Sequence, residues 1–325
     1  MHVDQGSTVN LCLVSAGLSS SSYYYRSKPG RRGKEASKYT RMKDGSVVPN
    51  DQVVADIRKL LNQEFVDYGY IKVTHYLNKR LGYLINRKKV YRLMKEHKLL
   101  NSRRVVDRSP RLWVEDLVPD PQGCFEHLEI DIKYIYVAGT RTNILQLTVI
   151  DVKTRYVLGY CQGYSIKYDD VIRLFNKIFA IIRLPKSYYV RSDNGSQFVA
   201  GEVRKFFEFQ SGATHEFTKP ATPQQNAHIE AFHSIINRVI CQRFYFDDFK
   251  ELKNTMQRFI KFYNTDRIHS GIDYESPLHE IRKTRPNFKP VWVADYSNDN
   301  PLLSNQLQGL ALEEDAKQEK NHYIT

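Results

Sequence analysis

Apolar residues recur at helical spacing in three short segments of the first third of the chain. The first segment follows Asn50, a predicted N-cap, and the second runs from Tyr70 to Leu81 and ends at Gly82. The third starts from Asn86 and places Val90 and its apolar neighbours on one face. Three short helices in this order predict a small all-α helix-turn-helix domain over residues 46–100, whose last helix would enter the DNA major groove.

The third predicted helix is strongly basic outside its apolar stripe. Its cations are Arg87, Lys88, Lys89, Arg92, Lys95 and Lys98. Like charges on one helix repel each other, so this concentration favours a DNA-binding role. A small helical bundle with a solvated basic face is the open alternative.

The pattern changes to strand-like alternation after residue 120. Residues 126–137, 142–150 and 155–163 are predicted strands, and residues 169–183 are a predicted amphipathic helix. A short strand at 188–190 stops before Asp193. Further helices are expected around 199–210, 224–242 and 248–264. A three-stranded meander followed by alternating helix and strand predicts a mixed α/β sheet flanked by helices over residues 121–285.

The other segments lack such periodicity. Residues 1–45 read as a basic N-terminal arm or linker, residues 101–120 as a Pro-containing linker, and residues 286–325 as an acidic C-terminal tail. The net charge of +13 over 325 residues favours a nucleic-acid partner over a merely basic protein. The four cysteines show no zinc-ligand or disulfide pattern, and no segment approaches a membrane span. We therefore expect a reducing, cytoplasmic setting and no membrane partner.

Two carboxylates of the second predicted domain stand in unusual places. Asp131 lies in the middle of a strand of a covered sheet, where an acid is costly unless it is paired or binds a metal. Lys133 and Arg155 are alternative partners for it. Asp193 follows a strand end, where open α/β sheets bind ligands, although Asp-Asn-Gly is also a common turn sequence.

A third carboxylate, Glu230, lies on the predicted helix 224–242. It shares a face with His233 and Asn237, next to the apolar stripe of that helix. This face could look toward Asp131 and Asp193, but an ordinary exposed acid would show the same spacing. Three acids that converge can hold two divalent ions and drive phosphodiester chemistry.

The order of the surrounding motifs resembles a known family. The segments 131–135, 192–198 and 222–232 are similar to the three motifs of the DDE catalytic core of insertion-sequence transposases. Residues 263–270 followed by Pro277 resemble that family's closing motif, and residues 68–70 and 89–95 resemble its helix-turn-helix segment. More narrowly, the chain resembles the OrfB product of insertion-sequence family three, a relative of retroviral integrases.

The resemblance implies a ribonuclease H-like fold and strand cleavage and strand transfer at transposon ends. It assigns Asp131, Asp193 and Glu230 as catalytic acids and as ligands of two Mg²⁺ ions, with Mn²⁺ as a substitute. We expect DNA contacts from the basic helix and from residues around the acids. Those residues are Arg87, Lys88, Lys89, Arg92, Lys95, Asn194, Gln225, Asn226, His233 and Arg238.

The same resemblance implies partners. These are terminal-repeat and target DNA, further copies of the chain assembled on DNA, and OrfA as a fused or separate partner, all at the bacterial nucleoid. A catalytically inactive, transposase-derived DNA-binding regulator is the alternative function.

Overall fold

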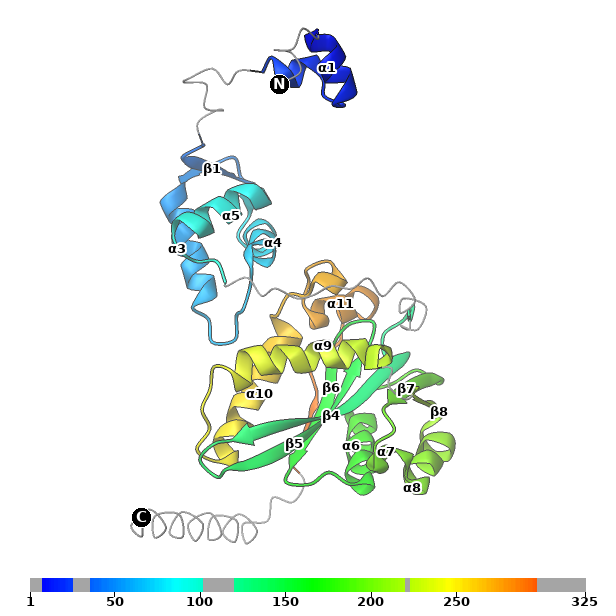
Figure 1. Cartoon of the computed structure of the whole chain (residues 1–325). Coiled ribbons are helices and arrows are strands. Elements are labelled where there is room, and N and C mark those ends of the chain that lie inside the picture. Colours follow the sequence, from blue (N-terminus) through cyan, green and yellow to red (C-terminus); the bar gives the residue numbers. More distant parts are fainter. Residues whose placement is uncertain (1–7, 26–35, 102–119, 220–222, 297–325) are drawn as a thin grey trace, which may run out of the picture.

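The computed structural model describes residues 8–25, 36–101, 120–219 and 223–296 (Figure 1). Two short N-terminal helices, α1 (Val9–Ser15) and α2 (Ser20–Tyr23), come first. A small domain and a larger α/β domain follow along the chain.

The three predicted helices of the small domain are confirmed as α3 (Asn50–Leu61), α4 (Tyr70–Arg80) and α5 (Arg87–Glu96). Their apolar faces bury one another in a common core that contains Val53, Val73 and Val90. Asn86 caps α5 as predicted, because its side chain accepts a hydrogen bond from the Lys89 N–H at 2.9 Å. Asn50 is instead the first helical residue, after an N-cap at Pro49.

The small domain also contains a short antiparallel sheet in the order β2-β1-β3, which the all-α prediction did not include. Its strands are β1 (Tyr39–Met42), β2 (Val47–Pro49) and β3 (Tyr83–Leu84). β1 lies inside the predicted arm 1–45, so that boundary must move toward the N-terminus. Strands of two to four residues are too short for their alternation to be recognised in the sequence.

The larger domain is built on a six-stranded mixed sheet in the order β8-β7-β4-β5-β6-β9. The strands are β4 (His127–Val137), β5 (Thr142–Asp151), β6 (Val157–Gly163), β7 (Tyr188–Ser192), β8 (Ala213–Phe217) and β9 (Val293–Tyr296). β4, β5 and β6 form the predicted antiparallel meander, and β7 runs parallel to β4. β8 runs parallel to β7, in a segment between the predicted helices 199–210 and 224–242 for which the sequence predicted no element. This is the expected ribonuclease H-like sheet.

Helices cover both faces of the sheet (Figure 1). One face carries α9 (Ala227–Ile236) and α10 (Phe249–Thr265). The other carries α6 (Tyr168–Ile181), α7 (Ser196–Val199) and α8 (Gly201–Lys205). β4 supplies both cores, because Leu128 and Ile130 pack on the α6 side while Ile135 and Val137 pack on the α9 side.

Shorter elements complete the domain. Wider π-helical turns continue α8 as Phe206–Ser211 and α9 as Asn237–Cys241, so the predicted helix 224–242 is a composite. A 3₁₀ turn, Pro223–Asn226, leads into α9. A second, Ser270–Ile272, precedes α11 (Pro277–Thr284).

The small domain is anchored on the larger one through the loop between α3 and α4. Phe65 of that loop is buried in the core beneath α9 and α10. In return, Ile268 of the larger domain is buried in the core of the small domain. The Asp67 carboxylate pairs with the Arg267 guanidinium at 2.7 Å, and the Tyr68 hydroxyl accepts a hydrogen bond from the Ile268 N–H. The segment resembling the family's closing motif therefore forms the joint between the domains.

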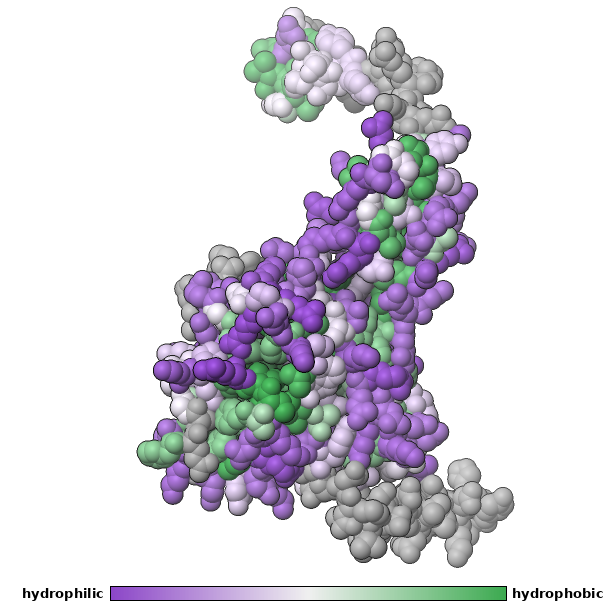
Figure 2. Space-filling view, turned by 180° about the vertical axis from the view of Figure 1, so that it is seen from behind, coloured by the Kyte–Doolittle hydropathy of each residue, from purple (hydrophilic) through white to green (hydrophobic). Residues whose placement is uncertain are grey.

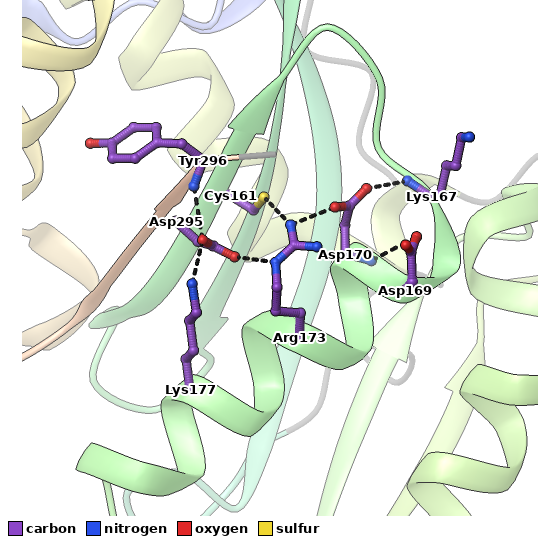
Figure 3. Close-up of polar contacts among 8 residues, drawn as sticks. All are labelled: Cys161, Lys167, Asp169, Asp170, Arg173, Lys177, Asp295 and Tyr296. Carbon is purple, nitrogen blue, oxygen red and sulfur yellow. Dashed lines mark hydrogen bonds and ion pairs between the residues drawn. The ribbon is translucent and has the colours of Figure 1, made fainter. Parts of the chain in front are cut away.

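The C-terminal part of the described chain returns to the sheet. β9 pairs in parallel with β6, so the first part of the predicted tail 286–325 contributes a strand. The buried Asp295 carboxylate accepts hydrogen bonds from Arg173 Nε at 2.9 Å and Lys177 Nζ at 2.6 Å, both on α6 (Figure 3). The larger domain therefore extends beyond the predicted boundary at residue 285. A strand of four residues that pairs with a distant strand has too short a pattern to be recognised in the sequence.

Hydrophilic residues dominate the rear view of the molecule, with one apolar area on the larger domain (Figure 2). Across the described ranges, none of the helices is long and apolar enough to cross a membrane. The four cysteines are all unpaired thiols.

Replacing Asp295 by Ala should lower the free energy of unfolding by about 1–2 kcal/mol, since two charge-assisted hydrogen bonds that hold β9 on α6 are lost. Urea unfolding followed by circular dichroism measures this. The exposed Asp247 is a matched control, and its Ala variant should change stability by less than about 0.5 kcal/mol. Equal stabilities of the two variants would show that the β9 contacts contribute little.

Candidate active site

Asp131 lies in the middle of β4, on the face that α9 covers. Its carboxylate is half-buried, and Oδ1 accepts a hydrogen bond from the Ile132 N–H at 2.7 Å. Oδ2 lies 3.4 Å from His233 Nδ1 on α9. The strand-to-helix contact predicted from sequence is therefore present, and its partner on α9 is His233. Neither Lys133 nor Arg155 pairs with Asp131 among the described contacts.

Asp193 follows the last residue of β7, the parallel neighbour of β4. Its Oδ1 accepts a hydrogen bond from the Gly195 N–H at 2.9 Å, which folds the turn back on the carboxylate. A Cβ at Gly195 would lie 2.3 Å from the Gln197 side-chain nitrogen and 3.0 Å from Asp193 Oδ1. Glycine at this position therefore leaves the room that the turn needs.

Glu230 lies in the first turn of α9, with its side chain exposed. The position of that turn depends on a fourth acid, Glu129 on β4. Glu129 Oε2 accepts hydrogen bonds from the N–H groups of His228 at 3.0 Å and Ile229 at 2.7 Å. A carboxylate at the positive end of a helix is stabilising, so Glu129 fixes where α9 begins relative to β4.

The three candidate acids influence one another electrostatically. Burial and the nearby Asp131 charge raise the pKa of Asp193, against the hydrogen bond from Gly195. Burial and the same Asp131 charge raise the pKa of Glu230. Among the described residues, His233 is the only basic side chain within ion-pair distance of any of the three. The site is therefore an acidic region without a compensating Lys or Arg.

Carboxylate oxygens are the ligands that Mg²⁺ prefers, so the donor chemistry suits a hard divalent cation. Such an ion would relieve the repulsion that raises the pKa of Asp193 and Glu230. In the residues that the structure describes, however, no three His, Cys, Asp or Glu side chains gather closely enough to form a metal-binding group. The three acids are thus close enough to interact electrostatically, but their side chains do not form a complete metal-binding group in the described residues.

Four of the residues expected to contact DNA lie in or next to the motifs that contain the acids. Asn194 and His233 lie beside the acids, and the Asn194 amide donates to the Thr218 carbonyl. Gln225 and Asn226 are only 8% and 5% exposed. Gln225 Oε1 accepts a hydrogen bond from the Lys219 N–H at 2.6 Å, so this amide is used within the protein. The burial of Gln225 and Asn226 depends on distant parts of the chain, so the local sequence motif could not predict it.

Arg238 also differs from the expectation. Its guanidinium lies 3.3 Å from the Asp67 carboxylate and donates to the Ser234 hydroxyl. It thus belongs to the joint between the two domains rather than to the acidic face of α9.

The basic helix α5 presents part of its charge to solvent. Arg87, Lys88 and Lys95 are exposed. Lys89 and Arg92 donate to the backbone carbonyls of residues 39 and 37, which ties α5 to the start of β1. Exposed cations therefore remain on α5 for a phosphate backbone, although fewer than the sequence suggested.

Glu129 is the site residue that the sequence did not reveal. It is fully buried, and burial raises its pKa to about 7 against the hydrogen bonds from Ile229 and His228. The only available signal was an acid two residues before Asp131 on the same face of one strand.

Two parts of the chain match the profiles of known domain families. The profile of an HTH-like domain matches residues 49–105. Profiles of the integrase core domain match residues 121–223 and 211–277, which include Asp131, Asp193 and Glu230. Residues 121–277 of the chain are thus similar to the integrase core domain.

Several curated relatives of the chain come from insertion elements, which is consistent with OrfB of family three. The transposase for insertion sequence element IS904 of Lactococcus lactis is 29% identical over 150 residues, covering 45% of this chain and 57% of the relative. A 39.2 kDa protein of insertion element IS476 from Xanthomonas euvesicatoria is 27% identical over 194 residues, covering 58% and 53%. The chain thus spans little more than half the length of these two relatives.

A solved structure with a similar chain is the simian T-cell lymphotropic virus intasome in complex with the PP2A regulatory subunit B56 gamma. The identity is 15% and the TM-score 0.45, covering 72% of this chain and 79% of that chain.

Replacing Glu129 by Ala should lower the free energy of unfolding by about 2–4 kcal/mol, because two buried N–H groups at the start of α9 lose their acceptor. Glu129→Gln keeps an oxygen for those groups and should cost less than half as much. Urea unfolding measures both, with the exposed Glu208→Ala as control. If Glu129→Ala matched this control, α9 would be held by its apolar face alone.

Proposed function

We propose that the chain is a DNA transposase that catalyses Mg²⁺-dependent strand cleavage and strand transfer at insertion-sequence ends. The observation that carries the proposal is the placement of Asp131, Asp193 and Glu230 on β4, after β7 and on α9 of an integrase core. The coupled charges of these acids and the donor chemistry of carboxylates support a divalent metal.

Two of the three acids are positioned by contacts between β4 and α9. Asp131 is fixed by the central strand and by His233, whose ring holds one carboxylate oxygen. Glu230 is carried by α9, which Glu129 anchors to the same strand. Two divalent ions held by the three acids would activate the attacking oxygen and stabilise the leaving oxygen of a phosphodiester.

DNA would be held at two places. The exposed cations of α5 suit a phosphate backbone beside a major groove, with Arg87, Lys88 and Lys95 as the available contacts. Asn194 and His233 lie beside the acids and would contact the strand that reacts. Assembly of further copies on DNA, and an OrfA partner or fusion, are also proposals for the whole protein.

One observation favours the second candidate, an inactive DNA-binding regulator. The acids do not form a closed metal-binding group among the described residues. A catalytic test with labelled terminal-repeat DNA and Mg²⁺ separates the candidates. Joined products indicate a transposase, cleaved but unjoined DNA a nuclease, and bound but intact duplex a regulator.

Isosteric replacement of each acid tests the assignment. Asp131→Asn, Asp193→Asn and Glu230→Gln should each reduce cleavage of terminal-repeat DNA by about a thousandfold or more, because each removes a negative ligand of the metals. Binding of the same DNA, measured by fluorescence anisotropy without Mg²⁺, should change by less than about threefold, because α5 is untouched. Glu208→Gln is the control. Full activity of the Asp193→Asn protein would exclude the assignment.

Metal binding can be measured without activity. Millimolar Mg²⁺ should raise the melting temperature of the protein by about 2–4 °C per kcal/mol of binding energy, relative to choline chloride at equal ionic strength. The protein that carries all three replacements should show no such rise. A rise that persists in that protein would place the ion elsewhere.

A further inference from the structure

The joint between the two domains encloses a strongly basic cavity on the side of α9 away from Glu230. The cavity has a volume of about 350 Å³ and is lined by Lys72, Arg155, Arg238 and Arg267, with no carboxylate among its lining residues. A neighbouring cavity of about 400 Å³ shares three of these cations and is lined by one acid, Asp67. Three of these cations therefore share a single lining carboxylate, Asp67, whereas Arg155 interacts electrostatically with the buried Glu129 and Asp151.

The donors of this cavity are incompletely used. Arg267 is 1% exposed, and its Nη2 pairs with Asp67. Its Nε and Nη1 atoms are buried without any hydrogen-bond partner in the described chain, and His269 Nε2 is in the same state. Buried donors without an acceptor are costly. Water could accept their hydrogen bonds, but it would not neutralise the excess charge.

The small domain places the start of a helix at the neighbouring cavity. Gly69, Tyr70 and Ile71 line the neighbouring cavity, and they form the start of α4. No side chain caps this helix and its first turn holds no acid, so its first N–H groups remain available. The N-terminus of an eleven-residue helix favours an anion.

Arg155 reaches the cavity from an unfavourable backbone conformation. It follows the turn between β5 and β6 with φ at +65°, which costs a residue with a side chain about 1–2 kcal/mol. Asparagine or glycine would adopt this conformation more easily. The guanidinium at this position donates to the Val152 carbonyl and lines the cavity beside Gly271.

The mutual repulsion of these cations is also apparent in Lys72. Burial and the charges of Arg267 and Arg238 lower its pKa to about 7, even though Asp67 acts in the opposite direction. An anion in the cavity would restore the full positive charge of this lysine.

We propose that these two neighbouring cavities bind a phosphate group where they share Lys72, Arg238 and Arg267, beside the start of α4. A phosphate presents several oxygens at once and so can accept from two guanidinium groups, an ammonium group and helix N–H groups together. Because the donors come from both domains, the bound phosphate would also lock the domains in one arrangement. The group could belong to a DNA backbone or to a free phosphorylated ligand.

Two variants remove charge from the cavity without breaking the Asp67–Arg267 pair. Lys72→Ala removes the half-buried ammonium group. Arg155→Asn removes a guanidinium and places a residue that tolerates the left-handed conformation. The exposed Lys59 and Arg58 on α3 provide matched controls as Lys59→Ala and Arg58→Asn.

The first measurement is isothermal titration of the full chain with inorganic phosphate, without Mg²⁺ and at constant ionic strength set by chloride. The wild-type protein and both controls should bind phosphate, and the two cavity variants should bind it at least about tenfold more weakly. Absence of phosphate binding by the wild-type protein, or equal binding by the cavity variants, would overturn the proposal. Since no catalysis is measured, either result is independent of the transposase proposal.

A second measurement identifies the source of the phosphate. If the cavity binds a DNA backbone, inorganic phosphate should compete with a short duplex, and both cavity variants should weaken duplex binding. If duplex binding is unchanged while phosphate binding is lost, the cavity serves a free phosphorylated ligand. Both outcomes support a phosphate site and differ only in what carries the phosphate.

Discussion

The hydrogen bonds from the start of α9 to the Glu129 carboxylate are the constraint on which the candidate site depends. Two of the three candidate acids lie on the elements that this contact joins, Asp131 on β4 and Glu230 on α9. A fully buried carboxylate is expensive, but here it accepts two backbone N–H groups that would otherwise be unsatisfied at a helix end. These two hydrogen bonds to Oε2 reduce the cost of burial at the point where strand and helix are aligned, while Oε1 is buried without a hydrogen-bond partner in the described chain.

Helix α9 separates two environments of opposite charge. One side of α9 carries the exposed Glu230, within electrostatic reach of Asp131, while another side borders a cavity lined by cations. The cations are contributed by the joint between the domains, where Asp67 and Arg267 form a buried pair. The HTH-like domain and the larger domain thus meet beside the helix that carries Glu230, and displacement of the small domain would change the cavity that α9 borders.

Sequence patterns predicted the elements whose cores are built from local repeats. The three helices of the small domain, the β4-β5-β6 meander and α6 each carry an apolar face several turns or pleats long, so their periodicity is clear. Position on these elements singled out Asp131, but the assignment of Asp193 and Glu230 came from the order of the surrounding motifs, because a turn residue or an exposed helical acid would show the same local pattern.

The remaining features depend on distant partners. The strand β9 and the strands of the small domain's sheet are only two to four residues long. β9 pairs with β6, and β3 pairs with β1, and these partners lie far away along the chain. Gln225 and Arg238 occupy motif positions, yet burial and the pairing with Asp67 direct them to structural roles. Glu129 was overlooked because nothing local distinguishes a helix-capping acid from a solvated one.

The parallel pairing of β9 with β6 also has a consequence for how the protein is made. Until residues 293–296 have left the ribosome, the β6 edge of the larger domain's sheet exposes unpaired backbone groups, and such edges can pair with other chains. Pairing between segments so far apart in sequence forms slowly. The β6 edge of the nascent chain therefore stays open until β9 has been made, and a product that stopped after α11 would keep an open edge able to pair with other chains.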